Sequence, residues 1–151
     1  MKMKGRRTLI FLLVSLALVS PVWALQDSEN PKDWFARART DLDDAQLISE
    51  KTTHYEQVCF LAHQSVEKSL KGALIGHQLQ PEKIHLTADL LTQLAQIRPE
   101  LGSHLAECRS LDRLYVPSRY PKMGITFTQE KASECLEEAK RLLDLIQERA
   151  R

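Results

Sequence analysis

The sequence predicts an all-α fold, an antiparallel (up-and-down) helical bundle of about five helices. Apolar residues recur every three or four positions through most of the 151 residues, which is the period of an amphipathic helix. Residues typical of helix starts precede several of these periodic segments. No segment alternates polar and apolar residues for long enough to predict a strand. A chain of this length forms one domain, with an additional segment at one end.

The first predicted helix follows a polar linker, residues 25–30. Asn30 can cap it, Pro31 occupies the first helical position, and Asp33 lies in the first turn. The helix runs to about Glu50. Its apolar face comprises Trp34, Ala38, Leu42 and Ala45.

The second predicted helix starts with a capping box, in which Thr53 is followed three positions later by Glu56. It ends near Gly76 and is followed by a loop at residues 77–83. Its apolar face comprises Tyr55, Cys59, Ala62, Val66, Leu70 and Ala73.

Three shorter or later segments complete the bundle. Residues 86–97 form a short third helix, and Pro99 opens a fourth whose inward residues are Leu101, Leu105, Cys108, Leu111 and Leu114. Thr128 caps the last helix, where Glu137 and Arg141 are spaced to form a surface ion pair. Its core residues are Ala132, Cys135, Leu136, Ala139, Leu142, Leu143 and Ile146.

Residues 1–24 have the composition of a signal peptide. A basic start with Lys2, Lys4, Arg6 and Arg7 precedes the apolar run TLIFLLVSLALVS and a small-residue cleavage pattern at Val22 and Ala24. We expect cleavage after Ala24 and a secreted or periplasmic protein. Two alternatives stay open, an uncleaved anchor and a start codon assigned too far upstream, which would make the domain cytoplasmic.

Charge and cysteine content limit the function further. Four of the 21 Lys and Arg residues lie in the leader, so 17 basic residues face 20 acidic ones and the remaining net charge is −3. Nucleic acid could therefore bind only at a local basic patch. Cys59, Cys108 and Cys135 have no zinc-ligand spacing, and we expect three buried free thiols. No metal and no cofactor is expected.

The stretch YVPSRYP, residues 115–121, interrupts the helical pattern. Arg119 can hold a phosphate with two hydrogen bonds, Tyr115 or Tyr120 can stack on a base, and Lys122 adds charge. The structural alternative is that the tyrosines cap the bundle. Arg119 would then pair with an acid of the first helix, Asp41 or Asp44.

A polar stripe on the second helix is the other candidate for binding. Gln64, Glu67, Lys68 and Lys71 adjoin its apolar face, although a solvated face would look the same. His85, just before the third helix, is either a hydrogen-bonding group at a helix start or an acid–base group. His54, His63 and His77 have no convincing metal-ligand spacing.

Several of these stretches together resemble one known family. They are DWFARARTDLDDAQLI, YEQVCFLAHQSVEKSLKGAL, KIHLTADLLTQL and LDRLYVPSRYP, in that order. The resemblance is to the HEPN family, "higher eukaryotes and prokaryotes nucleotide-binding", and covers roughly residues 31–147. The predicted helical domain is residues 31–151. One departure is HLTADL, where the family often has His-Asp-Leu.

The resemblance implies one of two activities. Many HEPN proteins are dimeric ribonucleases with an Arg, four to six residues and then a His near the start of a late helix. Others bind nucleotides or pair with small nucleotidyltransferases in toxin–antitoxin operons. No histidine follows Arg119, which favours the second kind. Arg98 and His104 match the ribonuclease spacing but open the fourth helix, with Pro99 and Gly102 between them.

We therefore expect a non-catalytic module that binds a nucleotide or a protein partner, such as a nucleotidyltransferase. Two alternatives are a toxin-type ribonuclease with an unorthodox site and an envelope interaction domain that has lost nucleotide binding. A homodimer is expected from the resemblance and from the long apolar faces of the second and fifth helices.

Overall fold

A computed structural model describes residues 27–121 and 123–148 of the chain. Within these residues there are no strands, and the all-α prediction is confirmed. The predicted leader and Lys122 lie outside the described residues. The helices are α1 (Pro31–Lys51), α2 (Tyr55–Gly76), α3 (Thr87–Ala95), the 3₁₀ helix η2 (Pro99–His104), α4 (Leu105–Tyr115) and α5 (Gln129–Gln147).

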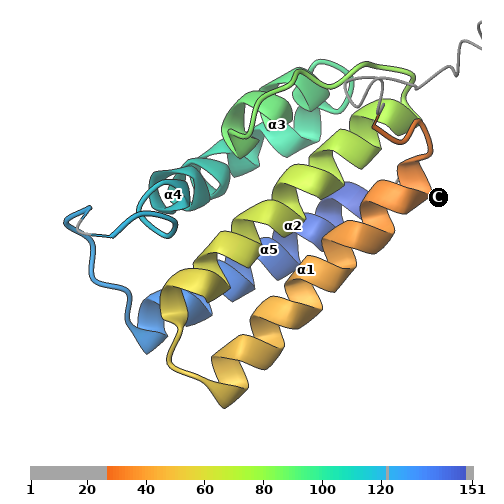
Figure 1. Cartoon of the computed structure of the whole chain (residues 1–151). Helices are drawn as coiled ribbons and strands as arrows, with labels where there is room; N and C mark the ends of the chain where they lie inside the picture. The colour runs from red at the N-terminus through yellow and green to blue at the C-terminus, as the bar shows by residue number, and fades with distance from the viewer. Residues whose placement is uncertain (1–26, 122, 149–151) are drawn as a thin grey trace, which may run out of the picture.

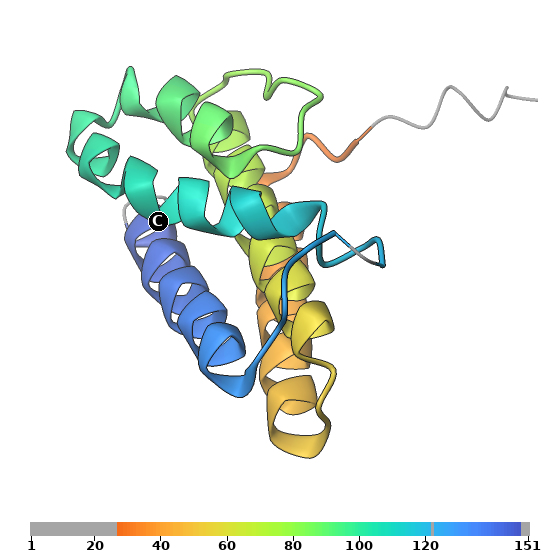
Figure 2. The same cartoon turned by 90° about the vertical axis from the view of Figure 1, so that its left-hand side faces the viewer.

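The three long helices α1, α2 and α5 form the body of the bundle, and α3 and α4 lie across one side of it (Figures 1 and 2). α1 and α2 are antiparallel and joined by a three-residue connection. α2 and α5 run parallel, since Cys59 and Cys135 meet near their starts and Gln147 donates to Ser69 near their ends. The crossover through α3 and α4 makes this parallel pairing feasible.

Two of the three predicted side-chain caps at helix starts are confirmed. The Asn30 side chain accepts a hydrogen bond from the Lys32 amide, and Thr128 Oγ1 accepts one from the Lys131 amide. The capping box at Thr53 is wrong, because α2 begins at Tyr55 without a side-chain cap. Pro99 opens the predicted fourth helix as the 3₁₀ helix η2, and α4 follows from Leu105.

The core lies between the three long helices and extends under α3 and α4. All seven core residues predicted for α5 are buried. Gly72 lets α1 approach α2 closely, because a Cβ atom there would lie 2.9 Å from both the Phe35 ring and the Trp34 Cβ. A side chain at this position would push the two helices apart.

The expectation of three free thiols is wrong. Cys59 and Cys135 form a disulfide that joins α2 to α5 across 76 positions of sequence. Cys108 is a buried free thiol, and its burial raises its pKa to about 12. Cys108 is therefore a protonated, apolar core residue at neutral pH.

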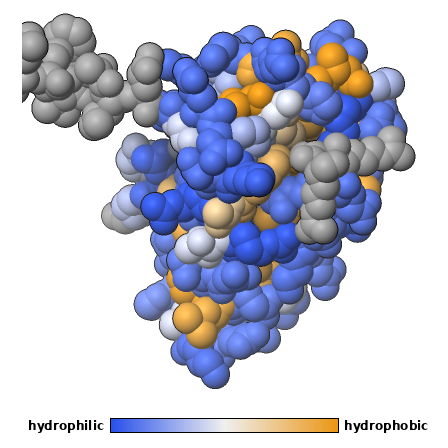
Figure 3. Space-filling model, turned by 90° about the vertical axis from the view of Figure 1, so that its right-hand side faces the viewer, coloured by the Kyte–Doolittle hydropathy of each residue, from blue (hydrophilic) through white to orange (hydrophobic). Residues whose placement is uncertain are grey.

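Arg141 does not pair with Glu137 as expected. Its Nε atom lies 3.2 Å from Glu107 Oε1 and so joins α5 to α4. The apolar faces of α2 and α5 pack inside the protomer, so the expected homodimer now depends on the resemblance alone. The face shown in Figure 3 is mainly hydrophilic, with apolar residues in small separate patches. In the described part of the chain, no helix is both long and apolar enough to cross a membrane.

Candidate functional site

Arg119 lies where α4 ends and the chain turns back. Hydrogen bonds from the Ser118 amide to Leu114 and from the Arg119 amide to Val116 keep this turn tight. The Arg119 guanidinium therefore returns over Tyr115 and donates from Nη1 to the Tyr115 hydroxyl at 2.8 Å.

Three aromatic rings surround the Arg119 guanidinium. Its central carbon lies 5.2 Å from the Tyr115 ring centroid and 5.8 Å from the centroids of both Phe60 and Tyr120. Such contacts attract a cation without neutralising it. The Arg119 side chain stays exposed, and no carboxylate in the described residues pairs with it. The predicted pairing with Asp41 or Asp44 is therefore wrong.

Tyr115 is the centre of an aromatic cluster. Its side chain is buried, and its ring stacks at 4.3 Å on the ring of His63, at 5.8 Å on His85 and at 6.3 Å on Phe60. Tyr115 thus belongs to the core, as the capping alternative expected, and also holds Arg119. Tyr120 is 55% exposed, so its ring is free to contact a ligand.

The buried carboxylate of Glu67 contacts most of the polar side chains predicted to form the α2 stripe. Glu67 accepts hydrogen bonds from Gln64 at 3.1 Å and from Lys71 at 2.8 Å, and His85 Nδ1 lies 3.2 Å from the same carboxylate. One alternative was that His85 forms a hydrogen bond at the start of α3, but its imidazole instead contacts Glu67 of α2. Because the His85 side chain is 62% exposed, it joins the Glu67 cluster to solvent beside Tyr115.

Lys68 is the one α2 candidate that the structure directs elsewhere. Its amino group pairs with Asp41 of α1, and both side chains are mostly buried. This contact joins α1 to α2 rather than contributing to the Arg119 region. Lys68 therefore stabilises the bundle and is removed from the candidate site.

A second carboxylate, Asp112, has a side chain that is only 11% exposed, and it supports the site through His63 and the start of α3. It accepts hydrogen bonds from the Thr87 and Ala88 amides, at 2.8 and 3.0 Å, and so caps α3 from a different helix. Thr87 Oγ1 and His63 Nε2 also contact it. Burial alone would raise the Asp112 pKa, but these hydrogen bonds, led by that of His63, lower it.

The sequence reasoning placed Phe60 on the same stripe of α2 as Gln64 and Lys71, but it missed Asp112 and His63 as parts of this region. One signal was available, since Asp112 and Tyr115 are three residues apart and lie on neighbouring positions of the same helix face. His63 was considered only as a metal ligand. In the described residues, no group of three His, Cys, Asp or Glu side chains converges to hold a metal ion.

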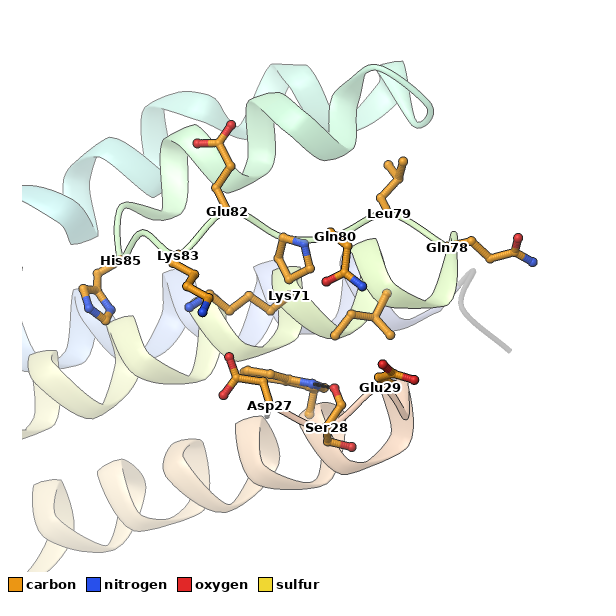
Figure 4. Close-up of a pocket in the computed structure, with 13 residues that line it drawn as sticks. Asp27, Ser28, Glu29, Lys71, Gln78, Leu79, Gln80, Glu82, Lys83 and His85 are labelled. Carbon is orange, nitrogen blue, oxygen red and sulfur yellow. Dashed lines mark hydrogen bonds between the residues drawn. The ribbon is translucent and has the colours of Figure 1, made fainter. Parts of the chain in front are cut away.

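A pocket of about 1090 Å³ adjoins the Arg119 region, between the start of α1, the end of α2 and the loop before α3 (Figure 4). Lys71 and His85 belong to both the pocket wall and the Glu67 cluster. The wall comprises Asp27, Ser28, Glu29, Trp34, Lys71, Ile75, Gln78, Leu79, Gln80, Pro81, Glu82, Lys83 and His85.

Arg98 and His104 do not form a ribonuclease pair. Arg98 is buried and donates to the backbone carbonyls of Ile146 and Leu145 in the last turn of α5. His104 contacts Glu107 at 2.6 Å. Both side chains have structural partners, and Arg98 in particular holds η2 against α5.

Comparisons with known proteins agree with this architecture. The pattern that defines the HEPN domain matches residues 31–149. A protein of Methanocaldococcus jannaschii named "Putative toxin MJ1304" is 26% identical over 131 residues, which cover 78% of this chain and 86% of that protein.

Two solved structures share the fold. ST0689, described as an archaeal HEPN homologue, superposes with a TM-score of 0.66 at 29% identity, covering 81% of this chain and 98% of the other. TT1696 from Thermus thermophilus gives a TM-score of 0.73 at 28% identity, covering 80% and 98%. The chain described here belongs to the HEPN domain family.

Proposed function

We propose that this protein is a nucleotide-binding HEPN module in which Arg119 holds a phosphate group. The observation that carries the proposal is an exposed guanidinium with no carboxylate partner among the described residues, fixed by three aromatic rings and the Tyr115 hydroxyl. One N–H of Arg119 is used internally, and the outer edge of the guanidinium is left for two parallel hydrogen bonds to phosphate oxygens.

The surrounding side chains suit the rest of such a ligand. Tyr120 offers an exposed ring for stacking, and His85 offers an exposed imidazole that Glu67 orients through Nδ1. With a predicted net charge of −3 outside the leader, attraction for an anion must come from this local cluster. We expect binding rather than catalysis, because no histidine follows Arg119 in the sequence.

The proposal is tested by titrating the protein with AMP and ATP in a calorimeter. Arg119→Ala should weaken binding about ten- to hundredfold, the loss expected for a bidentate, charge-assisted contact. Arg109→Ala is the matched control, because Arg109 is exposed on α4 and makes no hydrogen bond or ion pair with any described residue. Wild-type protein that binds neither nucleotide would refute the proposal.

A toxin-type ribonuclease is the second candidate, and the name of the M. jannaschii relative favours it. In this case His85 would be the proton-transferring group, since it lies beside Tyr115 and is held by Glu67. Purified protein should then cleave single-stranded RNA, and both His85→Ala and Arg119→Ala should abolish cleavage. Intact RNA after incubation with wild-type protein would exclude this function.

We further propose that the mature domain works in an oxidising compartment. The leader-like residues 1–24 and the Cys59–Cys135 disulfide support the same location independently. Fractionation followed by N-terminal sequencing should find a periplasmic or secreted protein that begins at Leu25. A cytoplasmic protein that begins at Met1 would contradict the proposal. The homodimer and the nucleotidyltransferase partner stay predictions.

A further inference from the structure

The pocket beside α1 reaches the Arg119 region through His85. His85 lines the pocket and also stacks on Tyr115, whose hydroxyl holds Arg119. Lys71 lines the pocket and also binds Glu67. A ligand whose phosphate lies on Arg119 would therefore extend past His85 into the pocket.

We propose that this pocket receives the base and sugar of the nucleotide whose phosphates lie between His85 and Arg119. The inference rests on the proposed function and adds a second half to its binding site. It predicts that the ligand is recognised by its planar ring as well as by its charge.

The pocket can hold a planar ring because one part of its wall is aromatic and apolar. The Trp34 indole is fixed by a 2.7 Å hydrogen bond from Nε1 to the Ser28 carbonyl. Ile75, Leu79 and Pro81 add apolar surface. A volume of about 1090 Å³ slightly exceeds the usual range of small-molecule sites, roughly 300–1,000 Å³, and is far more than a phosphate ion needs.

The basic side chains of the pocket gather at its His85 end. Figure 4 shows Lys71, Lys83 and His85 together on one side of the opening. The Lys71 amino group lies 5.9 Å from the Trp34 ring centroid, which puts a cation directly beside the aromatic surface. Lys83 is exposed and makes no ion pair with any described residue. Phosphates joined to a ring on Trp34 would meet these cations next.

Acidic side chains also line the pocket, and they favour a ligand that contains a sugar over one that consists of phosphate alone. Asp27 lies across the opening from the lysines, whereas Glu82 points away from it (Figure 4). Glu29 lies near the start of α1. A carboxylate accepts hydrogen bonds from sugar hydroxyls but repels a bare polyphosphate. The pocket therefore favours a nucleoside portion over inorganic phosphate.

Trp34 provides a direct readout of pocket occupancy. The sequence contains two tryptophans, Trp23 and Trp34, so Trp23→Phe in the full chain leaves Trp34 as the sole tryptophan, whose emission can be excited selectively over that of tyrosine. The probes are ATP, inorganic triphosphate and 5′-phosphorylated diadenylate. Comparison of ATP with inorganic triphosphate separates the contribution of the ring from that of the phosphates. Comparison of ATP with the diadenylate distinguishes a free nucleotide from the end of a nucleic-acid strand.

The expected result is that ATP or the diadenylate quenches Trp34 and binds at least about tenfold more tightly than inorganic triphosphate. Lys83→Ala should weaken ATP binding about three- to tenfold, as expected for one exposed charged contact. Lys51→Ala is the control, because Lys51 is exposed at the opposite end of α1. Whichever adenine ligand binds more tightly identifies its source.

Two results separate this inference from the proposed function. If ATP binds no more tightly than triphosphate and Trp34 emission is unchanged, the pocket is not the base site, although Arg119→Ala can still show that the phosphate site exists. If ATP quenches Trp34 and Arg119→Ala has no effect, the pocket binds alone and the link to Arg119 is refuted. Absence of any binding refutes both.

Discussion

The body of the bundle and the region where α2 meets α3 and α4, here called the junction, are held together by different kinds of contact. In the body, α1, α2 and α5 bury periodic apolar faces, and a disulfide joins two of them. At the junction, the buried carboxylate of Glu67 and the partly buried carboxylate of Asp112 each accept hydrogen bonds from several donors. The body is therefore held by apolar residues that recur along each helix, whereas the junction is held by individual hydrogen bonds and ion pairs between residues far apart in the sequence.

This difference explains why the candidate site lies at the junction. A buried carboxylate is costly unless its oxygens are paired, so such groups fix their neighbours strongly in place. Perturbed ionisable groups also cluster at functional sites. Arg119 is joined to these carboxylates through Tyr115, whose ring stacks on His63 and His85, and it pairs with no carboxylate among the described residues. The following changes should break the body or the junction selectively.

The largest expected loss of stability comes from removing the disulfide of the body. Replacing both Cys59 and Cys135 with Ala should lower the free energy of unfolding by about 3–5 kcal/mol, because the bond closes a long loop in the unfolded chain. Urea denaturation measures this loss. Cys108→Ala is the control, since it removes a buried thiol and leaves the disulfide intact. Equal stabilities of the two variants would show that the disulfide contributes little.

Asp112→Ala should be the most damaging single change at the junction. It leaves the Thr87 and Ala88 amides and the His63 ring without their acceptor, so the free energy of unfolding should fall by about 2–4 kcal/mol. Asp43→Ala, on the exposed face of α1, should change it by no more than about 0.5 kcal/mol. A small effect at Asp112 would mean that α3 does not need this cap.

The pKa of Asp112 predicts a loss of stability in acid. Although burial alone would raise this pKa, the hydrogen bonds from His63, Ala88 and Thr87 lower it below the ordinary value of 3.8. The stabilisation is therefore complete above the unfolded-state value and is lost as the pH falls through the folded-state pKa.

Asp112→Asn should flatten this acid dependence in melting curves recorded from neutral pH downward. Glu138, whose pKa is raised by burial, acts in the opposite direction but is present in both proteins. Parallel curves for the two proteins would show that Asp112 does not titrate with folding.

Gly72→Ala should separate α1 from α2 and so weaken the body. The new Cβ atom would lie 2.9 Å from Trp34 and Phe35, and relieving that contact should cost about 1–3 kcal/mol of stability. Gly76→Ala is the matched control, because its Cβ atom would meet Pro31 at an ordinary 3.6 Å. A Gly72→Ala protein as stable as wild type would show that α1 shifts away from α2 at little cost.

Helical periodicity and cap residues predicted most of the body. The predictions of the Asn30 and Thr128 caps were correct because a cap depends on residues within the first turn of its helix. The buried face of α5 was predicted correctly because it depends on spacing within that one helix. Thr53 was misread because its neighbour Thr52 ends α1, accepting from the His54 amide and donating to the Ile48 carbonyl. Because Thr52 and Thr53 are both typical cap residues, the local sequence alone does not show which of them ends α1 and which would start α2.

The junction was only partly predictable, because its contacts depend on the crossover. Periodicity gives no way to know that α2 and α5 are parallel neighbours, and hence that Cys59 meets Cys135. Arg98 was weighed as a catalytic group from its spacing to His104, whereas it binds carbonyls 47 and 48 residues away. Local sequence marked Arg119, Tyr115 and His85 as important but could not show which of them touch.

The central claim is that Arg119 binds a ligand and contributes little to the fold. It is tested most directly by measuring thermal unfolding and ATP affinity on the same preparation of Arg119→Ala. We predict a loss of stability of about 1 kcal/mol, from the lost hydrogen bond to Tyr115 and the lost ring contacts, together with a ten- to hundredfold weaker affinity, about 1.5–3 kcal/mol. A variant that melts several degrees lower than wild type and binds ATP equally well would contradict the claim.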